Sequence, residues 1–256
     1  MVKILVFDTE TTDLPPKLHD VWKQRELLEQ NLLTSVESWF LNNTLKLYPS
    51  IIQLSYILYD TEDPINAKII NNYIDLPNEV VISDSSFKVH HISKEIISNK
   101  ENKLTIDKAL NEFMNDAKMA DEIVAHNVAF DRRMILAELL RIFDKNHENI
   151  KLMMNNSKFK CTMNDTIKIC NLKMTINYFN LMEQKYDSFD KLKPPKLIES
   201  YKHYFHNFQD NGVLHDAIID VVICLRVYCK YKYKLDIYNM NKKIDEYIHS
   251  FTTLHV

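Results

Sequence analysis

Glycine is nearly absent from this chain, which has Gly212 as its single copy among 256 residues. Phosphate-binding loops of the P-loop and dinucleotide type need several glycines, because their backbone approaches the phosphate closely. The chain therefore cannot form either loop. Asn, Lys, Ile and Tyr are abundant in compensation, as an A/T-rich genome would produce, so the depletion reports composition bias more than function.

Cysteine is also scarce, and no pair of its copies has CxxC spacing. Most of these residues have apolar sequence neighbours. We therefore expect reduced thiols in the core in place of a zinc site or a disulfide framework. The residues concerned are Cys161, Cys170, Cys224 and Cys229.

The sequence has neither an excess of positive charge nor a long apolar run. A net charge of -3 and a pI near 6.4 argue against the broad basic surface of a chromatin protein, although a local basic groove would not change the total. No run of about 18 apolar residues occurs, and no signal-type segment precedes Asp8. We expect a soluble intracellular protein, cytoplasmic or nuclear, that does not associate with a membrane.

The length and apolar content fit one α/β domain. A chain of 256 residues with 46% hydrophobic side chains can bury one large core. The apolar run at 3–7 predicts a first strand, and two more strands are predicted at 50–60 and 67–75, which indicates an antiparallel start to a sheet. A short strand is expected at 122–125, and the polar region 144–160 is expected to be a loop. Helical periodicity predicts helices at 106–117, from about 130, at 162–172, at 196–206 and from about 215 to the end.

Two segments are expected to embellish this single domain of residues 1–256. In residues 15–48, apolar residues recur at helical spacing, which predicts a helical insertion after the first strand. Its Trp22, Trp39 and Phe40 are too apolar to be left in water together, so the insertion should pack on the body or on a second subunit. Residues 235–256 are expected to form a C-terminal helical extension.

Asp8 and Glu10 stand two residues apart at the carboxyl end of the apolar run Lys3-Ile4-Leu5-Val6-Phe7. In a strand this spacing places both carboxylates on one face. Two like charges there repel each other unless a cation lies between them. The pair therefore predicts a divalent metal site.

Two further acidic groups occur later, in His126-Asn127-Val128-Ala129-Phe130-Asp131 and His215-Asp216-Ala217-Ile218-Ile219-Asp220. Taken alone, Asp131 is better explained as compensation of a helix dipole. Asp220 has apolar neighbours, among which a buried carboxylate needs a cationic partner or a metal. Asp216 is its rival, but its position suits a helix cap. His215 and Asp220 would lie roughly 140° apart on a helix, so His215 is expected on the preceding loop or first turn.

In their order and separation, DTETT at 8–12, HNVAFD at 126–131 and HDAIID at 215–220 resemble the DEDDh 3′–5′ exonucleases. This is the family of RNase T, oligoribonuclease and the polymerase proofreading subunit. The resemblance covers most of residues 1–230 and implies a ribonuclease-H-like fold, with a central mixed five-stranded sheet flanked by helices.

Shorter segments between these motifs carry the resemblance further. Residues 48–54 are similar to the second strand of the family, 87–93 to its His-Gly-Ile-Thr turn, and 195–201 to the helix before the last motif. The chain departs from the family pattern at Asp13 and His91, which stand where glycine is usual. Asp and His tolerate positive φ better than most side chains.

The resemblance implies a metal-dependent hydrolase with two divalent cations, Mg²⁺ or Mn²⁺, because the ligands are all oxygens. It implies His215 as the general base, since imidazole titrates near neutral pH. The implied metal ligands are Asp8, Glu10, Asp131 and Asp220. The implied substrate-binding residues are Thr11, Thr12, Leu14, His90, Ile92, Asn127 and Phe130. On its own, Phe130 is explained equally well by core packing.

The expected activity is removal of nucleotides from a single-stranded 3′ end. Both DNA and RNA stay candidate substrates, because motif spacing carries no information on contacts to the 2′-hydroxyl. The alternative is a nucleic-acid-binding or polymerase-accessory module with vestigial catalysis, against which the retention of four carboxylates and His215 argues. A purely structural helical protein would leave the clustered acids unexplained. Whether the chain forms a homodimer is left open.

Overall fold

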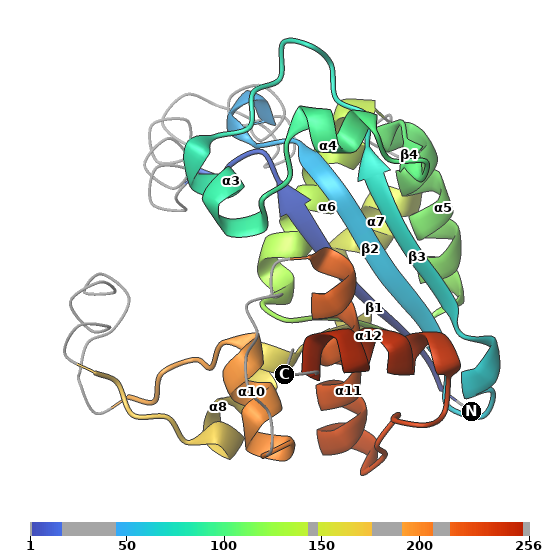
Figure 1. Cartoon of the computed structure of the whole chain (residues 1–256), viewed down its shortest axis with the longest axis vertical. Coiled ribbons are helices and arrows are strands. Elements are labelled where there is room, and N and C mark those ends of the chain that lie inside the picture. The colour runs from blue at the N-terminus through green and yellow to red at the C-terminus, as the bar shows by residue number, and fades with distance from the viewer. Residues whose placement is uncertain (1, 17–44, 143–147, 176–190, 207–215, 253–256) are drawn as a thin grey trace.

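The computed structural model describes residues 2–16, 45–142, 148–175, 191–206 and 216–252 (Figure 1). Within them, one six-stranded sheet has the strand order β4-β3-β2-β1-β5-β6. The strands are β1 (Lys3–Thr11), β2 (Ile51–Asp60), β3 (Lys68–Ile74), β4 (Lys103–Leu104), β5 (Glu122–Ala125) and β6 (Phe159–Cys161). The predicted mixed α/β sheet is confirmed, with six strands where five were expected.

β1 is an interior strand, antiparallel to β2 and parallel to β5. Asp8 lies opposite Ser55 and Glu10 opposite Gln53, and a bulge follows between Glu10 and Thr11. Both acidic residues therefore stand where β1 stops pairing regularly. The parallel neighbour β5 ends beside this edge, so the chain that follows β5 is delivered to the same place.

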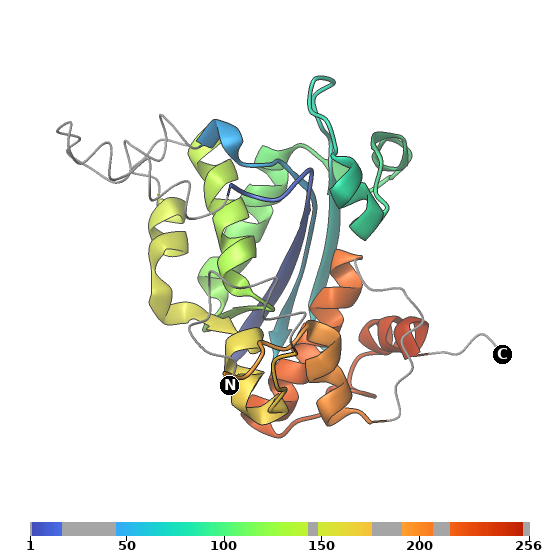
Figure 2. The same cartoon turned by 90° about the vertical axis from the view of Figure 1, so that its left-hand side faces the viewer.

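Helices cover both faces of the sheet (Figure 2). α5 (Ile106–Met119) and α6 (Val128–Ile142) cover one face, and α7 (Glu148–Met154) packs on α6. α11 (Ala217–Tyr233) covers the other face and contacts both β1 and β2. Three more helices extend this second layer: α8 (Thr162–Cys170), α10 (Leu197–Tyr204) and α12 (Lys242–Thr252).

Alternation along β1 divides the core into two apolar clusters. Ile4 and Val6 pack with α11, whereas Leu5 and Phe7 pack with α5 and α6. Successive strand residues point to opposite faces. The same alternation assigns Asp8 and Glu10 to the face that α11 covers.

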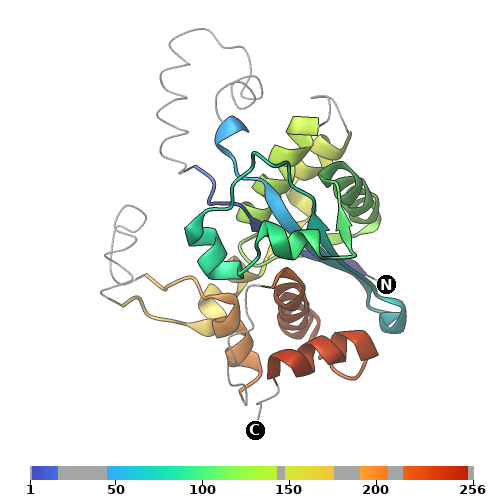
Figure 3. The ribbon, with the colours of Figure 1, turned by 45° about the horizontal axis from the view of Figure 1, so that its top comes forward.

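Two short helices, α3 (Asp84–His90) and α4 (Lys94–Ser98), lie beyond the carboxyl end of β1 (Figure 3). The Ser83 amide donates to the Thr12 carbonyl at 2.8 Å, which ties α3 to the end of β1. His91 ends α3 with φ at 56°, so the residue in the place of the family glycine does adopt the left-handed conformation. Asp13 is not among the described residues with positive φ.

Two expectations for the second half of the chain were wrong. Residues 144–160, expected to be a loop, contain α7 and the start of β6. α7 buries only Asn149, Ile150 and Met153, and β6 is a three-residue edge strand, so neither element has a long apolar pattern. The helix expected from 215 to the end is divided, because Lys234 ends α11 with φ at 60°.

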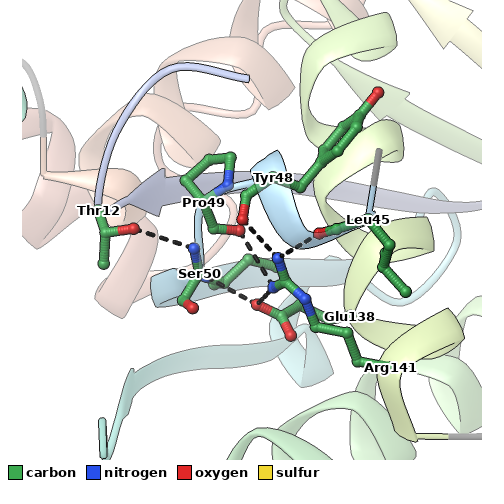
Figure 4. Close-up of polar contacts among 8 residues, drawn as sticks. Thr12, Leu45, Tyr48, Pro49, Ser50, Glu138 and Arg141 are labelled. Carbon is green, nitrogen blue, oxygen red and sulfur yellow. Dashed lines mark hydrogen bonds and ion pairs between the residues drawn. The ribbon is translucent and has the colours of Figure 1, made fainter. Parts of the chain in front are cut away.

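Most of the expected insertion, residues 17–44, lies outside the described residues, but its two ends meet. The Thr12 amide donates to the Ser50 carbonyl, and the Ser50 amide donates to the Thr12 hydroxyl, both at 2.9 Å. The Arg141 guanidinium binds the carbonyls of Leu45, Tyr48 and Pro49 and forms an ion pair with Glu138 (Figure 4). The chain therefore returns to the sheet through a polar anchor on α6.

The four cysteines are free thiols; Cys224 and Cys229 are buried in the core as expected, whereas Cys161 and Cys170 are only partly buried. Among the described helices, none combines the length and apolar character needed to cross a membrane.

Candidate active site

Three carboxylates converge at the end of β1. Each of Asp8, Glu10 and Asp220 offers an oxygen that lies within 4.8 Å of an oxygen of the other two. β1 supplies the first two from one face, and the first turn of α11 supplies Asp220 from the helix that covers that face. The structure thus brings together residues that are about two hundred positions apart in sequence, as a metal site requires.

Asp131 reaches the same region from the opposite layer. It lies in the first turn of α6 and is only 2% exposed. Its Oδ1 accepts hydrogen bonds from the Thr9 amide at 3.0 Å and the Thr9 hydroxyl at 2.8 Å. Thr9 stands between Asp8 and Glu10 in β1, so its side chain points to the opposite face of the sheet, which α6 covers. Asp131 is therefore held beside the group of three and is not part of it.

Burial and the charges of neighbouring acids raise the pKa values of Asp8 and Glu10, and burial raises that of Asp131. Burial, reinforced by Asp131 and Asp220, raises the pKa of Asp8 well above its ordinary value. Burial and the charge of Asp220 raise the pKa of Glu10 to about 9. Burial raises the pKa of Asp131 to about 7, although the Thr9 hydrogen bonds oppose this shift. A bound cation would remove the repulsion, so the arrangement fits a divalent metal.

The start of α11 is fixed to β2 by two side chains. Asp216 caps the helix by accepting from the Ile218 amide at 3.3 Å, as predicted from its position. Gln53, which lies opposite Glu10 in the sheet, donates to Asp216 at 2.9 Å and accepts from the Ala217 amide at 3.3 Å. Through these bonds, the strand that neighbours Glu10 sets the position of the helix turn that carries Asp220.

A pocket of about 620 Å³ opens over the carboxylates. Asp8, Glu10, Asp131 and Asp220 lie along one part of its lining, and the segment from Lys193 to Ile198 lies along another. The remaining lining residues are Thr9, His126, Asn127, Phe130 and Met163. Of the residues expected to bind substrate, Asn127 and Phe130 therefore line this pocket.

The other expected substrate-binding residues lie elsewhere. Thr11, Thr12, His90 and Ile92 are buried, and their polar atoms bind the chain itself. His90 Nδ1 accepts from the Ile92 amide at 2.9 Å, which leaves the Nε2 proton to bond the Thr11 carbonyl at 3.2 Å. These residues shape the end of β1. Leu14 is 72% exposed beside them, and His215 lies outside the described residues.

The sequence of the chain matches the model of a known protein family. The RNase T model, described as Exonuclease, matches residues 5–228. The chain belongs to the RNase T exonuclease family. This match confirms the resemblance drawn from the three acidic motifs, and the carboxylates of Asp8, Glu10 and Asp220 are close enough together that they could hold a metal ion.

Solved structures agree on the fold of this exonuclease. Exonuclease I of E. coli, in a zinc-bound complex with single-stranded DNA, matches with a TM-score of 0.56 and 13% identity over 98% of this chain and 43% of the other. Exonuclease I of Methylocaldum szegediense matches with a TM-score of 0.52 and 12% identity over 98% and 43% of the two chains. The exonuclease thus spans less than half the length of these proteins. Among curated proteins, none matches the sequence significantly.

Several residues of the site were not assigned a role from sequence. Thr9 and Gln53 hold the acidic residues, and His126 lines the pocket. Gln53 is a polar residue within the apolar run Ile51-Ile52-Gln53-Leu54, which is a signal for a buried polar contact. The Lys193–Ile198 wall carries no comparable signal, because it adjoins the pocket only through the tertiary fold.

Proposed function

We propose that this exonuclease hydrolyses phosphodiester bonds at single-stranded 3′ ends, releasing nucleotides one at a time with two divalent cations. The observation that carries the proposal is the convergence of Asp8, Glu10 and Asp220 at the end of β1. The fold supports it, since E. coli exonuclease I has been solved in complex with a dA16 oligonucleotide and matches with a TM-score of 0.56. A single-stranded substrate is accordingly the first to test.

The residues present fit divalent cations of the Mg²⁺ or Mn²⁺ type. Carboxylate oxygens are the donors that these ions prefer, and the half-buried Asp8 and Glu10 are repelled by the neighbouring acids without them. Asp8, Glu10, Asp131 and Asp220 would hold the ions. When bound, the cations supply charge stabilisation for the scissile phosphate and activation of the attacking water.

The protein side chains supply the remaining functions. His215 precedes the Asp216 cap of α11 and would take the proton from the attacking water, a role that suits the pKa of imidazole. Phe130 and Asn127 line the pocket beside the acids and would contact the terminal nucleotide. Contact between an aromatic ring and a base tolerates any sequence. Such a site would accept many 3′ ends.

The test is digestion of matched single-stranded DNA and RNA oligonucleotides labelled at the 5′ end, with Mg²⁺, with Mn²⁺ and with a chelator. A ladder of labelled products that shortens by one nucleotide per step, only with metal, supports the proposal and shows which sugar is preferred. Immediate release of a labelled mononucleotide would contradict the 3′ to 5′ direction. Cleavage in chelator would contradict the metal assignment.

A further inference from the structure

The segment Lys193–Ile198 forms a fixed wall of the pocket that contains the carboxylates. His126 Nε2 lies 3.0 Å from the Pro195 carbonyl oxygen, and His126 Nδ1 lies 2.9 Å from the Thr162 hydroxyl. Because a carbonyl only accepts, Nε2 carries the ring proton and Nδ1 accepts from Thr162. Burial lowers the pKa of His126 to about 4. The wall is therefore held to β5 and α8 by a neutral ring that adds no charge to the pocket.

The charges on this wall are not equivalent. Lys193 forms an ion pair with Glu199. Glu199 also accepts from the Lys196 backbone amide at 2.7 Å, which fixes the backbone where α10 begins. The Lys196 side chain is exposed on the pocket, and among the described residues none forms an ion pair or hydrogen bond with its ammonium group. Lys196 is thus a cation on a fixed backbone, in a pocket whose other charged residues are the four carboxylates and the paired Lys193.

We propose, on the basis of the proposed function, that Lys196 binds a phosphate of the single-stranded substrate adjacent to the scissile one. The carboxylates and their cations take the scissile phosphate. The rest of the strand is a polyanion, and two divalent cations only balance the charge of the four carboxylates, so a further positive charge along the pocket favours its binding. Lys196 supplies this charge, and Pro195 and its His126 bond keep it in place. A lysine recognises a phosphate as a point charge, without reading sequence.

The experiment compares Lys196→Met, Lys196→Arg and the control Lys168→Met in the full chain. Lys168 is an exposed lysine on α8 that does not line the pocket, so the control makes the same change in net charge. For each protein, kcat/KM is measured over a series of salt concentrations on a labelled single-stranded oligonucleotide. It is also measured on the p-nitrophenyl ester of thymidine 5′-monophosphate, which contains only the scissile phosphate.

We expect Lys196→Met to lower oligonucleotide kcat/KM up to about fivefold and to lower the ratio of oligonucleotide to ester kcat/KM. The slope of log kcat/KM against log salt should become shallower by roughly 0.7, the value for one phosphate contact on a single strand. Lys196→Arg should restore the wild-type slope, because it keeps the charge. Lys168→Met should keep both the slope and the ratio.

Two results would overturn the assignment of Lys196. One is a Lys196→Met enzyme with the wild-type slope and ratio, and the other is an equal change in Lys168→Met, which would show an effect of net charge alone. Failure of the proposed function is distinct from both, because the wild-type protein would then hydrolyse neither substrate with Mg²⁺. An unchanged thermal midpoint in each variant confirms that the fold is intact.

Discussion

At the residue scale, the alternation of side chains along β1 determines how each carboxylate of the site is held in place. Asp8 and Glu10 point to the layer of α11 and meet Asp220 there, whereas Thr9 points to the layer of α6 and holds Asp131. A one-residue shift in the register of β1 would exchange these faces and separate the acids. The long apolar run before Asp8 is what fixes that register, because both of its faces are buried.

Replacement of Asp8 by Asn should abolish nuclease activity without destabilising the metal-free protein. The change keeps the size of the side chain but removes a negative charge that repels Asp131, Asp220 and Glu10. We expect activity to fall more than about a hundredfold, as for loss of a metal ligand or its support, and the metal-free thermal midpoint to hold or rise. Oligonucleotide digestion and thermal unfolding measure the two effects. A variant that cleaved at the wild-type rate would remove Asp8 from the metal site.

Replacement of His215 by Ala should lower the rate and leave metal binding nearly intact. A general base contributes roughly 10²–10⁴-fold to a rate, and an imidazole at this position is not needed to hold the ions. We expect kcat to fall by that factor, while the rise in thermal midpoint on addition of Mg²⁺ stays the same. His203→Ala serves as the control, since this histidine lies on α10 outside the pocket. If the His215→Ala variant were as active as the control, the proton of the attacking water would have to be taken by another group.

At the scale of elements, the ends of the expected insertion are closer to each other than their separation in sequence suggests. Thr12 and Ser50 are joined by hydrogen bonds, and Arg141 holds the returning chain at Leu45, Tyr48 and Pro49. A short linker can therefore span the gap with little entropic cost.

Replacement of residues 17–44 by a short polar linker should leave a folded enzyme that still cleaves a dinucleotide with metal. The carboxylates, the pocket wall and the Arg141 anchor all lie outside the replaced segment. We expect the preference for substrate length, or the oligomeric state, to change instead. Digestion of oligonucleotides of graded length and size-exclusion chromatography measure these outcomes. Loss of dinucleotide cleavage in a folded variant that binds metal would place the segment in the active site.

Most elements lie where the sequence predicted them, including the short strand β5 and the helices α8 and α10. β1, β2, β3, α5 and α6 agree with their expected positions, because each buries a full face or stripe. α7, β4 and β6 were missed, since a seven-residue helix with few buried residues and edge strands of two and three residues have no period to detect. These two edge strands are defined by their pairing with β3 and β5 and not by their own composition.

The candidate site divides in the same way. The local pattern singled out Asp8 and Glu10 at a strand end and Asp220 among apolar neighbours, whereas Asp131 was proposed only through the resemblance to the exonuclease family. The Lys193–Ile198 wall was not found, because its place over the acids depends on the bond from His126 to Pro195, across 69 residues. The role of Gln53 depends likewise on contact with Asp216, which is 163 residues away. Tertiary hydrogen bonds of this kind leave no regular spacing in the sequence.

At the scale of the whole molecule, the metal site links stability to pH. In the metal-free protein the pKa of Glu10 is raised from 4.5 to about 9, and that of Asp131 from 3.8 to about 7. Between the ordinary and the raised values, the folded protein binds more protons than the unfolded chain. The free energy of unfolding therefore falls as pH rises. Each group contributes its full stabilisation below its ordinary pKa and loses it as pH rises through its raised pKa.

We therefore expect the metal-free protein to lose stability between about pH 5 and pH 9, by at most about 1.4 kcal/mol per pH unit for each group. Mg²⁺ should act in the opposite sense, because it binds the deprotonated carboxylates and releases their protons. Its stabilising effect, which grows with the ratio of free metal to Kd, should increase over the same window. Thermal unfolding across this pH range, in chelator and in Mg²⁺, gives both curves.

Glu10→Gln provides the matched control for this linkage. It removes the group with the pKa of about 9, so the metal-free curve should become flatter in the alkaline part of the window, while the part due to Asp131 near pH 7 persists. The Mg²⁺ effect should weaken at every pH, since one ligand is lost. A metal-free protein whose stability rises from acid to alkaline pH would show that the pKa values of these acids are not raised by burial. The carboxylate group at the end of β1 would then have to be open to solvent.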